Sequence, residues 1–402
     1  MDRLTEQLAH ALKSITGYIY PNEIELHWGI LIVIYPYLTG LVAGAFILAS
    51  LVKVFKVKAL EPTYRLALLT ALSFLIIAPV PLLSHLGHPE RFYEILFTPN
   101  SKSAMAMFGF VYAWYLMMVL LLEIWFDYRA ELVRWAEEST GFKRLAYRAL
   151  ALWSSDKSDK ALAFDKRAVR LITLVGIPSA FLLHGYVGFI FGSIKANPWW
   201  SSVLIPVVFL FSSIVSGIAL MLVIYLVTSL WRRKKIDMPC IDKMSEFLLY
   251  ALIIDFSLEL LDFVHRLYQS EESIEILGNM ISGRLFISLI IVQMLMGTIL
   301  PLIALGITRV RRRVLPEELR RMIYLLAAIF VQAGIFSTRW NVVIGGQLFS
   351  KSLRGLTIYK MEVLGIEGLL MAILLLVLPF VILGVIVKIL PPWEEEVHSP
   401  TI

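Results

Sequence analysis

Long apolar runs alternate with short polar stretches along the whole chain. Nine of these runs are long enough to cross a lipid bilayer as a helix, which takes about 20 residues. They cover residues 28–52, 66–86, 104–126, 171–194, 202–230, 244–265, 284–308, 322–338 and 362–388. Because lipid offers no partner for a free peptide group, each run predicts a transmembrane helix. The pattern therefore predicts an all-α integral membrane protein with about nine transmembrane helices.

The composition agrees with a membrane protein and excludes several kinds of site. Of the 402 residues, 58% are hydrophobic and 17% are charged, whereas soluble domains carry about 25% charged residues. Cys240 is the single cysteine, which excludes an internal disulfide and a cluster or zinc site held by thiolates of this chain alone. No polar segment is large enough to house an ATPase or a cluster-binding module.

The basic residues predict the orientation of the chain. The loops that precede every even-numbered span, together with the C-terminus, carry 26 of the 37 lysine and arginine residues. Cytoplasmic loops are the basic ones, so we expect an outside N-terminus, an inside C-terminus and a location in the cytoplasmic membrane. The runs 232–235 and 311–313 are then topological anchors, and no nucleic-acid role is expected for them.

This topology divides the chain into three parts. Residues 1–26 form an outside segment in which Leu4, Leu8, Leu12 and Ile15 have the spacing of an amphipathic surface helix. Residues 27–390 form the transmembrane domain, whose long cytoplasmic loop covers 127–167. Residues 391–402 form a cytoplasmic tail.

The sixth span carries an unusual number of acids. Asp255, Glu259, Asp262 and Arg266 fall on one helical stripe, with His265 beside them. Charges inside a bilayer are costly and indicate a function by default. One interpretation is a proton relay from the middle of the membrane to the outer surface. The other is structural, with Arg266 neutralising Asp262 and the remaining acids held by hydrogen bonds.

Four histidines lie in or near the outer half of the predicted membrane. They are His27, His85, His184 and His265. Paired histidines on facing helices could ligate haem b axially. Histidines with a tyrosine could instead bind a quinone, donating a hydrogen bond to a carbonyl and accepting a proton from the quinol. The residues alone leave both interpretations open, together with that of ordinary interfacial histidines.

Small residues recur at a spacing of four in two spans. Gly40 and Gly44 lie in the first span, and Gly188 and Gly192 lie in the fourth. Such a spacing lets two helix backbones approach closely. Plain helix packing is the simpler interpretation, and a flat wall for a cofactor is the alternative.

Four segments of the chain form distinctive motifs: Leu86-Gly87-His88-Pro89-Glu90-Arg91-Phe92, Leu96-Phe97-Thr98-Pro99-Asn100, Gly185-Tyr186-Val187-Gly188-Phe189 and Lys195-Ala196-Asn197-Pro198-Trp199. Together they resemble the NrfD/PsrC family, the membrane subunits of polysulfide reductase and related complexes. The later segment 339–347, which begins Arg339-Trp340-Asn341, resembles the longer branch of the family. That branch includes the hydrogenase-2 membrane subunit and the DsrP/Hme subunits of sulfur metabolism.

The resemblance implies a fold and a function. Such proteins contain two four-helix bundles, here with an extra helix, and usually hold no haem. They exchange electrons with a quinone, which would be menaquinone here, near the outer face. A ferredoxin-like iron–sulfur subunit docks outside, and further cytochrome and membrane subunits are expected. No haem, iron–sulfur cluster or other metal centre is expected in this chain.

The resemblance also implies roles for individual residues. His27 and Tyr186 match the quinone-contacting histidine and tyrosine of the family. Glu23 stands where polysulfide reductase has asparagine, so it either accepts a quinol proton or caps a helix. His85 and His184 are secondary candidates for the quinone site. Arg91, Arg339 and Asn341 are expected to hold the outer loops or the partner subunit.

The sequence thus predicts a quinone-reactive membrane subunit of a respiratory complex, of the kind associated with sulfur or sulfite metabolism. A complete active site is not expected in this chain alone. Three alternatives remain: a proton or ion transporter without quinone, a haem b cytochrome, and a purely structural anchor.

Overall fold

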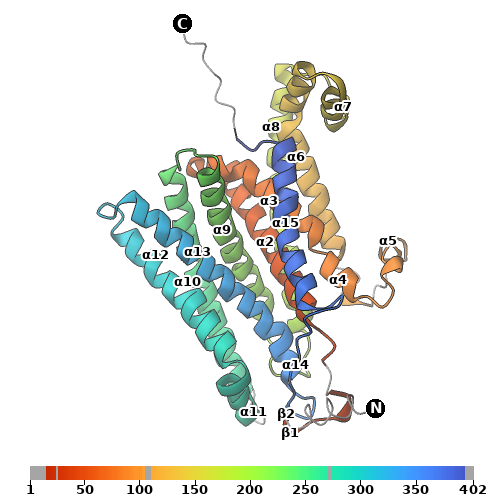
Figure 1. Cartoon of the computed structure of the whole chain (residues 1–402), viewed down its shortest axis with the longest axis vertical. Coiled ribbons are helices and arrows are strands. Elements are labelled where there is room, and N and C mark those ends of the chain that lie inside the picture. Colours follow the sequence, from red (N-terminus) through yellow and green to blue (C-terminus); the bar gives the residue numbers. More distant parts are fainter. Residues whose placement is uncertain are drawn as a thin grey trace.

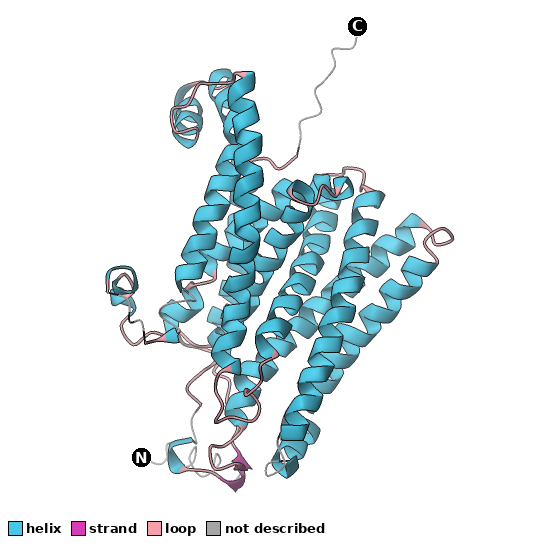
Figure 2. Cartoon of the chain, turned by 180° about the vertical axis from the view of Figure 1, so that it is seen from behind, coloured by secondary structure: helices cyan, strands magenta, loops and turns pink. Residues whose placement is uncertain are grey.

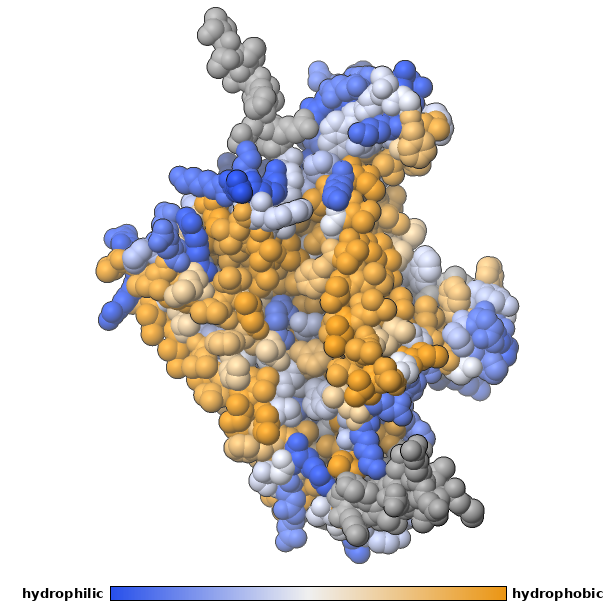
Figure 3. Space-filling view, viewed as in Figure 1, coloured by the Kyte–Doolittle hydropathy of each residue, from blue (hydrophilic) through white to orange (hydrophobic). Residues whose placement is uncertain are grey.

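The computed structural model describes residues 15–23, 26–98, 100, 102–104, 110–269 and 274–393. Long helices run side by side along most of its length, and short elements cluster at one end (Figures 1 and 2). Figure 3 shows a broad apolar band around the middle of the visible face, with polar residues gathered toward both ends. The structure thus agrees with the prediction of an all-α integral membrane protein.

The long helices account for most of the chain. They are α2 (Ile30–Lys53), α3 (Tyr64–Ile77), α6 (Phe110–Glu138), α8 (Asp159–Gly192), α9 (Ile205–Trp231), α10 (Met238–Gln269), the π-helical η7 (Phe286–Ile299) continued by α12 (Leu300–Val310), α13 (Glu317–Trp340) and α15 (Leu369–Ile389). Shorter helical elements lie between them: η1 (Pro21–Glu23), η2 (Lys58–Thr63), α4 (Val80–His85), η3 (Pro89–Arg91), α5 (Glu94–Phe97), α7 (Gly141–Leu150), α11 (Ile274–Asn279), η6 (Met280–Arg284), η8 (Asn341–Gly345) and α14 (Gly346–Leu348).

Two neighbourhoods of helices share a central contact. In the first, α2 packs on α3 and α8, and α6 packs on α3 and α8. In the second, α9 packs on α10 and α13, while α13 packs on η7 and α12. The contacts of α2 with α9 and α13 join the two neighbourhoods, and α15 covers α3 from outside. The most extensive buried core therefore lies along α2, nearly all of whose side chains are buried.

Seven helices among the described residues are long and apolar enough to cross a membrane. They are α2, η2–α4, α8, α9, η7–α12, α13–α14 and α15. The two other predicted spans, 104–126 and 244–265, correspond to α6 and to the charge-bearing α10, and residues 105–109 of the first lie outside the described residues. The predicted count of nine and the arrangement in two bundles plus one helix therefore stay predictions.

Two predicted boundaries change in the structure. The run 66–86 is divided between α3 and α4 at Ala78 and Pro79, because proline lacks the N–H that would continue the helix. The predicted loop 127–167 is largely helical, since α6 continues to Glu138 and α8 already begins at Asp159. A buried ion pair, Arg129 Nη2 to Asp165 Oδ2 at 2.6 Å, ties these two extensions together.

The end opposite α7 contains a small element that the sequence analysis missed. Strand β1 (Thr16–Tyr18) pairs antiparallel with β2 (Arg354–Leu356), with Gly17 opposite Gly355. The predicted amphipathic helix through Leu4, Leu8 and Leu12 lies outside the described residues, as does the whole tail after Trp393. This sheet ties the start of the described chain to the segment between α14 and α15.

Glycines mark the closest approaches between helices. A Cβ atom built on Gly44 would lie 2.7 Å from the Cα of Gly217, so α2 and α9 are in backbone contact there. A Cβ atom on Gly297 would lie 2.3 Å from the Cα of Gly334, where η7 meets α13. Gly188 is similarly close to Pro206. These contacts agree with the packing interpretation of the predicted glycine spacing.

Candidate functional site

A fully buried arginine lies where the two helix neighbourhoods meet. Arg339, near the end of α13, has no exposed surface. Its Nη2 atom lies 3.0 Å from His184 Nε2 on α8 and donates to Ser212 Oγ on α9 at 2.5 Å. Its guanidinium also stacks over the ring of Phe209, 4.1 Å from the centroid. One cation therefore joins three helices inside the predicted membrane.

The predicted span 322–338 ended just before Arg339, whereas the structure buries this residue between helices. The chain continues beyond Trp340 as the buried π-helical segment Asn341–Gly345 and then as α14. The apolar run in the sequence ends near residue 338, so the arginine looked like the residue that ends a span. Its burial depends on contacts from α8 and α9, which are far away in the sequence.

His184 is enclosed rather than open to a ligand. Its Nδ1 atom lies 3.4 Å from Thr39 Oγ1, and its Nε2 atom faces Arg339. The imidazole stacks on Phe209, with the two ring planes 25° apart. Gly40 allows the close approach, because a Cβ atom there would lie 3.1 Å from His184 Cε1. Both ring nitrogens are thus engaged, which removes His184 from the residues that face a quinone or a haem iron directly.

The first two acids of the predicted stripe on α10 face this arginine. Asp255 is buried and its Oδ1 atom has no hydrogen-bond partner among the described residues. The Glu259 carboxylate accepts from Thr338 Oγ1 at 3.4 Å. Both carboxylates interact electrostatically with Arg339. The predicted stripe therefore exists, and its inner half forms an ionic centre with Arg339.

The other half of the stripe, Asp262 and Arg266, forms an ion pair within α10. Arg266 donates to Asp262 through Nε at 2.7 Å, and the hydroxyl of Ser202 donates to the same carboxylate. The Arg266 guanidinium lies 5.3 Å from the ring centroid of Trp199. This is the neutralised arrangement that the structural interpretation expected for Asp262. His265 is adjacent, and its buried Nδ1 atom has no partner among the described residues.

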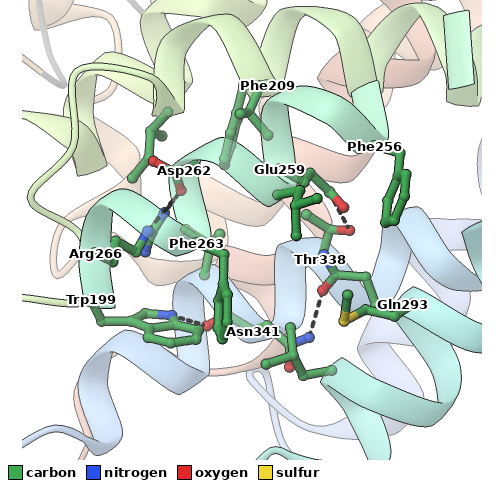
Figure 4. Close-up of a pocket in the computed structure, with 16 residues that line it drawn as sticks. Trp199, Phe209, Phe256, Glu259, Asp262, Phe263, Arg266, Gln293, Thr338 and Asn341 are labelled. Carbon is green, nitrogen blue, oxygen red and sulfur yellow. Dashed lines mark hydrogen bonds and ion pairs between the residues drawn. The ribbon is translucent and has the colours of Figure 1, made fainter. Parts of the chain in front are cut away.

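A small cavity with a mainly apolar lining and a few polar side chains lies beside the stripe, between α9, α10, η7 and α13 (Figure 4). Its volume is about 80 Å³, which is enough for a few water molecules. Glu259 and Asp262 both line it, together with Gln293 and Asn341. The cavity therefore gives water a place between two acids of the stripe.

Asn341 contacts the loop between α8 and α9. Its backbone carbonyl accepts a hydrogen bond from Trp199 Nε1 at 2.8 Å, and its side-chain Nδ2 donates to Gln293 Oε1 at 2.8 Å (Figure 4). Ser288 Oγ donates to Asn341 Oδ1 at 2.6 Å. The loop between α8 and α9 is thereby fixed to η8, which is in turn bonded to η7.

The predicted quinone residues lie at the end of the bundle opposite α7. One precedes α2, and the other lies in the last two turns of α8. His27 is exposed just before α2, and Tyr186 is half-buried on α8 and donates to Ala104 O at 2.5 Å. Trp28 and Phe191, their near neighbours, pack edge to face with centroids 6.0 Å apart. The two segments that carry the predicted residues therefore converge at this end.

Tyr35 is a further candidate in this region that the sequence analysis missed. It lies two turns into α2, is buried, and its hydroxyl has no hydrogen-bond partner among the described residues. It lies within electrostatic range of Tyr186. A buried hydroxyl without a partner is costly unless another group satisfies it. The tyrosine sits within an uninterrupted apolar run, so the sequence offered no signal for it.

The remaining predicted residues at this end are paired. Glu23 accepts from the hydroxyl of Ser350 and from Lys351 N at 2.9 Å, so it fastens the N-terminal segment to the loop before β2 rather than capping α2. His85 Nδ1 lies 2.7 Å from Glu367 Oε1. Arg91 binds Glu94 in the exposed loop after α4, and these hydrogen bonds lower the pKa of the Glu94 carboxyl.

The largest cavity that we describe lies elsewhere. A lateral groove of about 750 Å³ opens between α15 and the helices α2, α9, η7 and α13. Its lining is mainly apolar, but Tyr37 donates to Gln332 within it at 2.7 Å. Figure 3 shows a hollow with paler and blue residues beside α15, inside the apolar band. None of the predicted quinone residues lines this groove.

The fold and the site together indicate the class of protein. The chain is a multi-pass membrane protein with an ionic centre buried between its helices. Among the described residues, no group of three or more histidine, cysteine or acidic side chains is placed to hold a metal ion.

Comparison with known proteins then gives the family. The profile of the family described as "Polysulphide reductase, NrfD" matches residues 21–351. The chain therefore belongs to the NrfD family, as the resemblance in the sequence indicated.

Several named relatives support the same assignment. The chain is 32% identical to a selenate reductase subunit from Mesobacillus selenatarsenatis over 79% of this chain and 73% of that protein. It is 31% identical to a putative dimethyl sulfoxide reductase membrane subunit from Halobacterium salinarum over 49% of this chain and 42% of that protein. Protein NrfD of Escherichia coli is 29% identical over 50% of this chain and 59% of that protein. The family and these relatives indicate that the chain is a membrane subunit of an oxidoreductase complex.

Proposed function

We propose that this chain is the quinone-reactive membrane subunit of a respiratory oxidoreductase complex. It exchanges electrons between menaquinone or menaquinol and an iron–sulfur subunit docked outside the membrane, in sulfur or sulfite metabolism. The family described as polysulphide reductase supports this assignment. The relatives named as subunits of selenate and dimethyl sulfoxide reductases support it as well.

We further propose that the chain lies in the cytoplasmic membrane with its N-terminus outside and its C-terminus inside. The basic runs 232–235 and 311–313 occupy loops at the end that carries α7, and basic loops face the cytoplasm. The division into an outer segment 1–26, a transmembrane domain 27–390 and a tail 391–402 follows from this orientation. It places the converging segments around His27 and Tyr186 at the outer end.

The quinone ring binds, in this proposal, at the outer end between the start of α2 and the end of α8. The observation that carries the site is the buried hydroxyl of Tyr35, which has no hydrogen-bond partner among the described residues and lies on α2, the helix that packs on the helix of Tyr186. The Tyr35 hydroxyl offers a donor to a quinone carbonyl, and the Tyr186 oxygen, whose proton goes to Ala104 O, accepts a hydrogen bond from a quinol hydroxyl. The imidazole of His27 is exposed at the mouth of this site and does not cap α2. In the proposal, it is the base that takes a proton from a bound quinol.

The residues around this site have different roles. The pair of His85 and Glu367 lies at the same end and offers a second route by which a proton reaches the outer surface. Glu23 is held by Ser350 and Lys351, so we assign it to positioning the N-terminal segment. His184 lies two residues before Tyr186 on α8 and links that helix to Arg339.

Electron and proton flow separate at this site. A quinol that is oxidised loses both hydroxyl protons and a pair of electrons. The electrons pass to the external iron–sulfur subunit, and the protons leave through His27 and the neighbouring outer residues. In the reverse direction the same groups supply protons to the reduced quinone.

Proton translocation is a second candidate function, and a specific observation favours it. Asp255 Oδ1 is buried without a partner among the described residues, and Glu259, one helical turn further along α10, lines the small cavity. An intramembrane acid of this kind is a functional group by default. In this proposal, Glu259 exchanges protons with water in the cavity and with Asp255, and Arg339 balances the charge of the two acids.

The proposed quinone site predicts a specific pattern of activity. In the intact complex, we expect Tyr35→Phe and Tyr186→Phe each to raise the KM for menaquinol, by roughly 5- to 30-fold for one lost hydrogen bond to a ligand. His27→Ala is expected to lower kcat by on the order of 100-fold, because it removes the proton acceptor. Quinol-dependent reduction of the partner clusters is the measurement.

Tyr128→Phe is the matched control for the phenol variants. This tyrosine is also fully buried, but its hydroxyl donates to Pro391 O, at the end that carries α7. It is expected to leave the KM for menaquinol unchanged. The site assignment fails if the three variants at the outer end oxidise quinol like the unmodified complex, or if Tyr128→Phe impairs turnover as strongly as they do.

A further inference from the structure

An apolar groove of about 640 Å³ lies at the end of the bundle that carries α7, between α9 and α15. Its walls are aliphatic and aromatic side chains of these helices, with Leu66 of α3 behind them. Gly384 contributes a flat position in α15, where a Cβ atom would meet no other atom within 4 Å. The groove is therefore open space beside a membrane-spanning helix and has the shape to take hydrocarbon chains.

The mouth of this groove is basic. Arg232 follows the last residue of α9, and Lys388 lies in the last turn of α15. Neither side chain forms an ion pair with an acid within the described part of the chain. The Arg232 guanidinium instead stacks on the indole of Trp393, 3.8 Å from the ring centroid. Two cations thus border an apolar groove, and no acid within residues 15–393, as far as these are described, pairs with them.

Other basic residues close to this groove do form ion pairs with acids. Lys53 Nζ lies 3.2 Å from Asp127, and Arg65 Nε lies 2.7 Å from the same carboxylate. Both residues line an adjoining polar pocket of about 680 Å³ at the same end of the molecule. Arg232 and Trp393 line the polar pocket and the apolar groove alike. The stacked pair therefore stands at the boundary between an aqueous compartment and a hydrocarbon one.

We propose that this groove binds an anionic phospholipid from the adjacent leaflet. The acyl chains lie in the apolar groove between α9 and α15, and the phosphate lies between Arg232 and Lys388. Basic clusters at the ends of transmembrane helices recognise anionic headgroups in this way. Trp231 and Trp393, which also line the groove, suit the level of the headgroups, where tryptophan is enriched.

The chemistry of the groove favours a lipid over other occupants. A free phosphate would use the two cations but would leave the apolar groove unfilled. A transmembrane helix of a partner subunit would fill the groove, but it would bury Arg232 and Lys388 unless it brought acids of its own. A single anionic lipid satisfies both parts, since it carries the charge and the hydrocarbon in one molecule.

The test measures the lipids that stay bound to the intact complex. The complex is reconstituted in nanodiscs of equal parts phosphatidylglycerol and phosphatidylcholine, extracted in mild detergent and analysed by native mass spectrometry. We expect retained phosphatidylglycerol to exceed phosphatidylcholine, and the double variant Arg232→Gln/Lys388→Gln to lose this preference. The expected loss is roughly fivefold in affinity for each removed charge.

Two further variants separate the charge from the groove. Arg311→Gln/Arg313→Gln removes the same net charge from the same end, outside the groove, and should retain the lipid. Gly384→Leu keeps both cations but fills open space in the groove, so it should reduce lipid retention without lowering the melting temperature. Because no clash is expected at Gly384, this variant tests the site even if the double variant folds poorly.

Several outcomes would overturn the proposal. Equal retention by the unmodified complex and by the Arg232→Gln/Lys388→Gln and Gly384→Leu variants would show that the groove holds no lipid. Equal retention of phosphatidylcholine would show a groove without charge recognition. A partner helix seen in the groove in a structure of the whole complex would replace the lipid by a subunit interface. None of these outcomes bears on the quinone site at the opposite end.

Discussion

Substituting Gly217 by leucine is expected to prevent accumulation of the folded protein. A Cβ atom at this position would lie 2.3 Å from the backbone carbon and 2.4 Å from the Cα of Gly44, where α9 crosses α2. Neither atom belongs to a flexible side chain that could move aside. Overpacking usually costs about 1–3 kcal/mol, and a clash between two backbones inside the main core is expected to exceed this range. The measurement is the yield of monodisperse protein after extraction, with its melting temperature.

Gly306→Leu provides the matched control. This glycine is also in a membrane-spanning helix, α12, but a Cβ atom there would meet nothing within 4 Å. It should leave the yield and the melting temperature close to those of the unmodified protein. If Gly217→Leu folded as well as Gly306→Leu, the close contact of α2 with α9 would be wrong, and with it the approach of His184 to Arg339.

Substituting Arg339 by methionine is expected to destabilise the protein strongly and to abolish quinol-dependent turnover. The change keeps a long side chain but removes the cation that faces Asp255 and Glu259 and that contacts His184. Removing one member of a buried ionic group typically costs about 3–5 kcal/mol, because the remaining charge is left buried and uncompensated. Thermal unfolding in detergent and cluster reduction by menaquinol give the two readouts.

A second substitution distinguishes the loss of charge from the loss of packing. Adding Asp255→Asn to Arg339→Met removes the uncompensated acid, so the double variant should be more stable than Arg339→Met alone. Non-additivity of this sign is the signature of direct interaction between the two positions. A double variant that is less stable than both single variants would place the acid and the arginine in separate environments.

The long helices could be predicted from the sequence because their signal is local. An apolar run long enough to cross a bilayer fixes a helix by itself, since lipid leaves the backbone no other way to satisfy its hydrogen bonds. The start of α2 at Ile30 and the end of α9 at Trp231 each lie within a few residues of the predicted boundaries. The helical extensions across 127–167 were missed, because polarity alone does not distinguish a loop from a solvent-exposed helix.

The partners of the polar residues were harder to predict. The stripe on α10 could be read from helical periodicity, but its counter-ion Arg339 comes from a helix that lies some 80 residues further on. Tyr35 was invisible for a related reason: an aromatic residue in an apolar run is expected to pack, and only the three-dimensional structure reveals that its hydroxyl lacks a partner among the described residues. Pairing across helices depends on long-range contacts that no spacing rule in one sequence supplies.

Photolabelling with an azido-menaquinone is the most direct test of the central claim. The intact complex is irradiated with the probe, in the presence and absence of excess menaquinol, and the labelled peptides are identified by mass spectrometry. The proposal predicts labelling that menaquinol displaces, in peptides around His27–Tyr35 and around Tyr186. Displaceable labelling confined to the lateral groove, around Gln332 and Phe380, or no displaceable labelling of this chain, would contradict it.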